Sequence, residues 1–118
     1  SLHRTGAVLV FGSDAPVESP NPFWGMHAAV TRTKRDAPSG GDGWVTREKI
    51  HLREALEAYT LGPSFAAGLE DQLGRLAPGY LADLIVLDSD PLQCTPQGLA
   101  ELLPVATMVN GKWVFRNI

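Results

Sequence analysis

Residues 7–11 (AVLVF) constrain the fold most, because every position is apolar where a half-buried strand would alternate. A strand that is apolar on both faces is typical of the middle of a covered, usually parallel, sheet. A polar turn over residues 12–16 follows, and Asn21-Pro22 then predicts the N-cap and first residue of a helix to about Thr33. This order of strand, turn and helix predicts one βα unit of an α/β protein.

The middle of the chain predicts a loop and two helices. Residues 34–43 (KRDAPSGGDG) combine glycine, proline and charge in the way that surface loops do. Thr46 is the expected N-cap of a helix that runs to about Leu61. A second, short helix is expected from Pro63 to about Glu70.

The last third predicts strands. Pro78-Gly79 is a type II turn signal that joins a short strand near Leu76 to a clear strand over residues 82–87. Thr95 is expected to begin a small helix.

A hairpin is expected at the end of the chain. Strands over residues 105–109 and 112–116 flank Asn110-Gly111, the strongest short turn signal. We expect one face of this hairpin to lie on a core, and its apolar side chains to be Ala106, Met108, Trp113 and Phe115.

Composition limits the class of protein. The chain has 118 residues, of which 44% are hydrophobic and 19% charged, as in one soluble domain at most. A net charge of −3 without a basic stripe disfavours nucleic acid and anionic membrane surfaces as partners. The longest apolar run is too short to span a bilayer. The single cysteine, Cys94, excludes an internal disulfide and a cysteine-rich zinc site, and it favours a cytoplasmic protein.

The beginning of the chain is informative as well. It starts at Ser1 and has neither an initiator methionine nor a signal peptide pattern. A remnant of a cloning tag and a cut from a larger chain both fit this start. We expect in either case that the sequence is part of a longer protein.

Asp14 is the residue most suggestive of chemistry. A carboxylate directly after a buried parallel strand occupies the position where barrel and open α/β enzymes place catalytic groups. There it could ligate a metal or act as a base toward a metal-bound water. The alternative is that Ser13 and Asp14 only satisfy backbone donors in the turn before a proline. The residues alone leave both interpretations open.

The other chemistry-bearing residues predict no site. His3, His27 and His51 form neither an H-x-H nor an H-E-x-x-H pair, so their spacing indicates no metal centre. Cys94 has no positively charged neighbour that would activate its thiol. No phosphate loop, nucleophile elbow or dinucleotide fingerprint occurs.

The order of motifs resembles the C-terminal part of amidohydrolase family 3, whose members are metal-dependent hydrolases. The family's last barrel strand and helix have similar sequences here in FGSDAPVE (residues 11–18) and NPFWGMHAAVTR (residues 21–32). The helix that leaves the barrel is similar to EALEAYTLGPSFAAGLED (residues 54–71). The return to the small β-sandwich domain and its closing hairpin are similar to GRLAPGYLADLIVLDSDPL (residues 74–92) and VATMVNGKWVF (residues 105–115).

This resemblance implies roles for a few residues. Asp14 matches the aspartate at the end of the eighth barrel strand. In the family that residue contacts the metal, takes a proton from the hydrolytic water and later delivers one to the leaving group. Val17, Glu18 and Asn21 fall in the loop over the active site, where they are expected to contact a small-molecule substrate.

The resemblance also implies what the chain lacks. The family's histidine pairs and bridging ligand have no counterpart here, and a (β/α)8 barrel takes about 250 residues. We therefore expect an α/β fragment: the last βα unit of the barrel with linking helices in residues 1–70, and the C-terminal part of the β-sandwich domain in residues 71–118. The complete enzyme is expected to bind a divalent metal, zinc by preference, and to hydrolyse a non-peptide C–N or amide bond with metal-activated water. We expect this chain alone to bind no metal and to be inactive.

Two other interpretations remain. The chain could be a non-catalytic α/β module that self-associates, or one subunit of a split hydrolase. Because the apolar strand at residues 7–11 needs neighbours, we expect a homo-oligomer.

Overall fold

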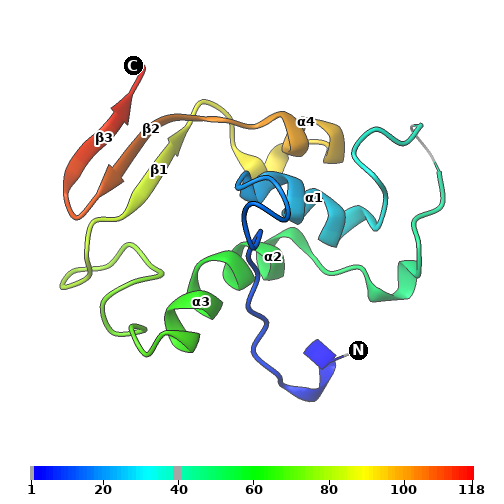
Figure 1. The fold of residues 1–118 in the computed structure, drawn as a ribbon, viewed down its shortest axis with the longest axis horizontal. Helices are drawn as coiled ribbons and strands as arrows, with labels where there is room; N and C mark the ends of the chain where they lie inside the picture. Colours follow the sequence, from blue (N-terminus) through cyan, green and yellow to red (C-terminus); the bar gives the residue numbers. More distant parts are fainter. Residues whose placement is uncertain (1, 39–40) are drawn as a thin grey trace.

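The computed structural model describes residues 2–38 and 41–118. Figure 1 shows a three-stranded sheet at one end of the molecule and the helices packed together beside it. In these residues the helices are α1 (Pro22–Thr31), α2 (Leu52–Tyr59), α3 (Leu61–Ala66) and α4 (Pro96–Glu101). The strands are β1 (Leu84–Leu87), β2 (Pro104–Val109) and β3 (Lys112–Arg116), and short 3-10 turns occupy Leu2–Thr5, Thr46–Glu48 and Pro91–Gln93.

The apolar segment at residues 7–11 is extended but is not a β-strand, so this prediction is wrong for the chain as it stands. The sheet formed by the described residues consists of β1, β2 and β3, and the segment does not join it. One backbone bond instead ties the segment to α2: the Phe11 N–H donates to the Ala58 carbonyl at 2.8 Å. Val8 and Val10 remain 54% and 49% exposed. The side chains are those of a buried strand, but the neighbours that would bury them are missing from this part of the structure.

Helix α1 begins as predicted, because its cap is encoded locally. The Asn21 side chain accepts a hydrogen bond from the Phe23 N–H at 3.0 Å, and Pro22 occupies the first turn. The helix ends at Thr31, and Arg32 caps it with a left-handed backbone, φ 59°.

The helix predicted to start at Thr46 begins later, so that prediction is wrong. Val45 has a left-handed backbone, and Thr46–Glu48 make a single 3-10 turn before Lys49 returns to an extended conformation. The true start of α2 follows His51, whose N–H donates to the Glu54 carboxylate at 2.6 Å. A glutamate at the third helical position stabilises the start of a helix in this way.

The second helix starts and ends earlier than predicted. Helix α3 runs from Leu61 to Ala66, so Pro63 lies in its first turn rather than before it. Proline is tolerated there because the backbone N–H groups of a first turn have no partner within the helix.

The core lies between α1, α2 and α4. It is built from Phe23, Met26, Ala55, Leu99 and Leu102, each at most 6% exposed. Figure 1 shows α4 above α1 and α2 below α1, and both helices pack against α1. Thr95 caps α4 as predicted, accepting from the Gly98 N–H at 3.1 Å.

The sheet has the antiparallel order β1-β2-β3, and the predicted hairpin is confirmed. Val109 pairs with Lys112 and Met108 with Trp113. The turn at Pro78-Gly79 also forms, but Leu76 before it is not in a strand.

The apolar hairpin face differs from the prediction. A register shift after Thr107 places Phe115 opposite Thr107 rather than Ala106. Ala106 is fully buried, but every residue of β3 is exposed, including Trp113 and Phe115. Within the described residues, β3 therefore lies on no core.

The loop predicted over residues 34–43 is irregular in its described parts, and residues 39–40 lie outside the described residues. In residues 2–38 and 41–118, no helix combines the length and the apolar character that crossing a membrane requires.

Candidate functional site

Asp14 lies in a tight turn at the end of the extended segment. Its backbone is left-handed, with φ of 50°, and its carbonyl accepts from the Val17 N–H at 2.9 Å. Such a conformation is uncommon for residues other than glycine, although aspartate tolerates it better than most. The carboxylate is exposed, and no hydrogen bond or ion pair joins it to another described residue. The turn is thus held by the backbone of Asp14, which leaves its side chain free.

The other predicted site residues divide into two groups. Glu18 and Asn21 line a hollow of about 650 Å³, together with Gly12 and Ser13 from the turn. Asp14 and Val17 do not line it, and Val17 is 76% exposed. Asp14 therefore follows two residues that line this hollow but does not line it itself. The Oδ1 atom of Asn21 is engaged in capping α1.

The lining of this hollow also includes aromatic and basic residues whose pairing no local sequence pattern indicates. The Arg35 guanidinium carbon lies 3.4 Å from the centre of the Trp24 ring, and that of Arg32 lies 5.2 Å from the centre of the Trp44 ring. Trp24 is fixed by its indole N–H, which donates to the Ala100 carbonyl at 3.1 Å. Burial raises the pKa of Tyr59, which also lines the hollow. A stacked arginine and tryptophan in a concave wall suit a flat or anionic group.

His3 and His51 both approach the Glu54 carboxylate, whereas His27 lies elsewhere, on α1. His3 pairs through Nε2 with the Glu54 carboxylate at 2.7 Å, and His51 is exposed at the start of α2. His27 is only 5% exposed, and its Nδ1 is enclosed without a hydrogen-bond partner. Burial lowers the pKa of His27, and the positive charge of Arg35 lowers it further.

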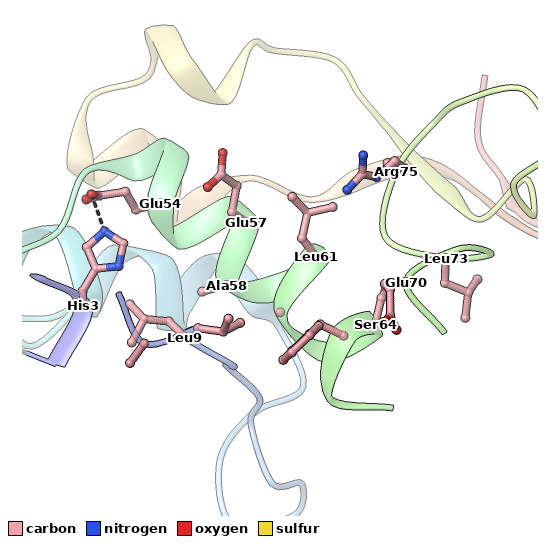
Figure 2. Close-up of a pocket in the computed structure, with 14 residues that line it drawn as sticks. His3, Leu9, Glu54, Glu57, Ala58, Leu61, Ser64, Glu70, Leu73 and Arg75 are labelled. Carbon is pink, nitrogen blue, oxygen red and sulfur yellow. Dashed lines mark hydrogen bonds and ion pairs between the residues drawn. The ribbon is translucent and has the colours of Figure 1, made fainter. Parts of the chain in front are cut away.

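A second hollow, of about 420 Å³, lies between the extended segment and the helices α2 and α3 (Figure 2). Figure 2 shows the His3–Glu54 pair at one end, and Glu57, Leu61 and Arg75 further along the wall. The pKa of Glu54 is lowered first by the His51 backbone hydrogen bond and then by His3. None of the predicted site residues lines this hollow.

The donor set does not fit a catalytic metal. No three His, Cys, Asp or Glu side chains of residues 2–38 and 41–118 come close enough to hold an ion. Asp14 offers one carboxylate, whereas catalytic sites for divalent ions take three or more protein ligands. The residues described here thus do not form such a site by themselves.

Comparison with known proteins places the chain in context. Residues 1–115 match the sequence model of the amidohydrolase family. A putative amidohydrolase of Bacillus subtilis (strain 168), YtcJ, is 34% identical over 117 residues, which is 99% of this chain and 22% of that protein. An N-substituted formamide deformylase of Arthrobacter pascens is 36% identical over 112 residues, which is 94% of this chain and 20% of that protein.

Two further similarities complete the comparison. Protein LONG AFTER FAR-RED 3 of Arabidopsis thaliana is 35% identical over 115 residues, 98% of this chain and 19% of that protein. The crystal structure of an amidohydrolase from Thermotoga maritima MSB8 superposes with a TM-score of 0.70 at 23% identity, covering 98% of this chain and 24% of that one. The chain thus spans about a fifth of the length of the curated relatives it matches.

Proposed function

The chain belongs to the amidohydrolase family, and from this premise we propose that it is the C-terminal segment of a metal-dependent hydrolase. The reaction is hydrolysis of a non-peptide C–N bond, an amide by preference, with a metal-activated water. The family assignment supports a hydrolase segment, and the name of the deformylase supports an amide substrate. The small share of each relative that the chain covers supports a segment rather than a whole enzyme.

The observation that supports the proposal most strongly is the environment of the Asp14 carboxylate. Its carboxylate is exposed and free of described partners, and the turn that presents it follows an apolar segment with the composition of a buried strand. A side chain used only to satisfy the turn would accept hydrogen bonds from nearby N–H groups. We therefore assign Asp14 as the one metal ligand and catalytic carboxylate that this chain contributes.

The division of the chain follows from this assignment. Residues 1–70 are the last βα unit of a barrel with its linking helices, and residues 71–118 are the end of a small β-sandwich domain. The extended segment at residues 7–11 supports this division, because its apolar side chains on both faces are those of a strand with neighbours on both sides. The exposed strand β3 supports the assignment of residues 71–118 to part of a larger domain.

The metal, zinc by preference, is not held by this chain alone. Asp14 is a single ligand, and no three His, Cys, Asp or Glu groups of the described residues come together to hold an ion. The remaining ligands of the proposal come from the rest of a longer protein. For that reason no catalytic step is assigned to the isolated chain, which we expect to be inactive.

Substrate contacts are proposed for the loop after Asp14. Glu18 lines the 650 Å³ hollow and is the strongest candidate. Val17 offers an exposed apolar contact, whereas Asn21 has only its amide nitrogen free, because its oxygen caps α1.

A second candidate is a self-associating module or a subunit of a split hydrolase. The exposed valines of the apolar segment, Val8 and Val10, favour it, since large apolar side chains that lie exposed together mark surfaces that another chain covers. The partner would then be a second copy or a separate polypeptide with the other barrel strands.

The experiment compares the full product of the gene with the 118-residue chain. The proposal expects the full product to bind a divalent ion and to hydrolyse an N-substituted formamide, and the 118-residue chain to do neither. Asp14→Asn in the full product should abolish turnover, whereas Asp88→Asn, an exposed carboxylate after β1, should leave it intact. Full activity of the Asp14→Asn protein contradicts the role of Asp14. A full product no longer than this chain contradicts the segment itself.

A further inference from the structure

A third hollow, of about 410 Å³, lies where the end of α1, the loop after it and the start of α4 meet. Its wall holds three cationic side chains, Lys34, Arg35 and Lys49, and no Asp or Glu of the described residues. Neither lysine forms an ion pair with a described carboxylate, and nor does Arg35. Positive charges gathered without an acidic partner repel one another, and a bound anion would relieve that repulsion.

Arg35 is held in place rather than loosely solvated. Its guanidinium lies over the Trp24 ring at 3.4 Å from the ring centre. Stacking of this kind fixes the plane of the guanidinium while leaving its N–H groups free to donate at their edge. A fixed arginine loses less entropy when it binds an anion than a free one does.

His27 adds a buried polar group to the same wall. Its imidazole is 5% exposed and lines the hollow, and its Nδ1 has no hydrogen-bond partner among the described residues. A buried polar atom without a partner costs stability and is rare in folded proteins.

Hydroxyl groups complete the lining. Thr33 and Thr95 both line this hollow, but the Thr33 hydroxyl already donates to Thr31 Oγ1 at 2.8 Å. Thr95 accepts the Gly98 N–H as its cap, which leaves its own hydroxyl proton free to donate. Cationic and hydroxyl donors around one concave space match the three acceptor oxygens of a phosphate group.

We propose that this basic hollow binds the phosphate group of a small molecule, with Lys34, Arg35 and Lys49 around the phosphate oxygens and the His27 ring behind them. Three cations favour a dianion over a carboxylate, and the volume exceeds that of phosphate alone, so a phosphate monoester fits better than the free ion. This site is separate from Asp14, which does not line the hollow, and the proposal does not depend on hydrolytic activity.

The test is a titration of the 118-residue chain with inorganic phosphate and with glycerol 3-phosphate, followed by amide and imidazole NMR signals at constant ionic strength. We expect saturable shifts at Lys34, Arg35 and Lys49, tighter binding of the ester, and a rise in the pKa of His27 when the anion is bound. Lys49→Gln should weaken binding about tenfold, because it removes a charge-assisted hydrogen bond. Lys112→Gln, on the exposed strand β3, is the matched control and should not weaken it.

Three results would overturn the proposal. One is a response to phosphate that does not saturate, or that sodium chloride reproduces. Another is an equal loss in Lys49→Gln and Lys112→Gln, which would mean general charge attraction. The third is saturable binding with an unchanged pKa of His27, which would place the anion elsewhere.

Discussion

The Phe11 N–H donates to the Ala58 carbonyl at 2.8 Å, and this bond fixes the extended segment against the helices. Four residues after Ala58, Gly62 of α3 also lies directly against this segment. A Cβ atom on Gly62 would clash with the Leu9 carbonyl oxygen and crowd the Val10 Cα. The approach of the segment that presents Asp14 therefore depends on a position where only glycine fits.

The first prediction concerns this close approach. Gly62→Ala should destabilise the chain by about 1–3 kcal/mol, because the added methyl group meets backbone atoms that cannot move alone. Urea unfolding followed by circular dichroism measures the change. Gly98→Ala in α4 is the matched control, since a Cβ atom added there would lie 3.4 Å from its nearest neighbour, Thr95 Oγ1, and alanine favours a helix. Equal stability of Gly62→Ala and the parent chain would contradict the packing described here.

The second prediction separates the two roles of Asn21. Asn21→Ala should cost about 1 kcal/mol, because α1 loses the side-chain cap on the Phe23 N–H. Asn21→Asp keeps the accepting oxygen and should restore most of that stability. Thermal unfolding of both variants measures this, and a substrate contact through the amide would appear separately, as lost turnover in Asn21→Asp of the full gene product. Equal destabilisation by both substitutions would count against the cap.

The third prediction concerns pH. Burial and Arg35 hold the pKa of His27 below 6.5, so the unfolded chain takes up the proton more readily than the folded chain. The contribution of His27 to the free energy of unfolding should therefore be fully present above about pH 6.5. It should be lost as the pH falls from 6.5 toward the lower pKa that His27 has in the folded chain. His27→Gln should remove this part of the acid sensitivity in urea titrations at several pH values.

The matched control for that experiment is His51→Gln, because His51 is exposed at the start of α2. Its pH profile should follow that of the parent chain. A profile of His27→Gln that is as steep as the parent profile would show that His27 does not cause the acid sensitivity.

The fourth prediction is self-association through the apolar segment. Val8 and Val10 are about half exposed, and a second copy that covers them would remove them from water. The double change to Val8→Ser and Val10→Ser should weaken association about tenfold or more, since burying a valine side chain contributes about 1.5 kcal/mol. Val17→Ser, in the loop after Asp14, is the control and should have no effect. Sedimentation that finds the parent chain monomeric at all concentrations would contradict the prediction.

Local signals explain what could be predicted from the sequence. The caps at Asn21 and Thr95 and the turns at Gly79 and Gly111 depend on a few adjacent residues, and all four form where expected. The start of α2 differs from the prediction because Val45 adopts a left-handed backbone that its side chain disfavours, and this interrupts the helix expected from Thr46.

Long-range relationships explain the rest. The apolar composition of residues 7–11 is that of a central strand, but strand formation requires partners that the described residues do not supply. The register shift beside Thr107 and the stacking of Arg35 on Trp24 bring together groups that no local pattern connects. Asp14 was found from its place after the apolar segment. Its free carboxylate became evident only from the structure.

The proposal that Asp14 is the one metal ligand of this chain is tested most directly by zinc content. The measurement is made on the purified 118-residue chain after dialysis against a small excess of zinc. A lone Asp14 carboxylate is too few ligands for a stable site, so we expect much less than one ion per chain. One tightly held ion per chain, lost in Asp14→Asn, would show that this chain assembles a metal site by itself. It would contradict the proposal that the other metal ligands lie in the rest of a longer protein.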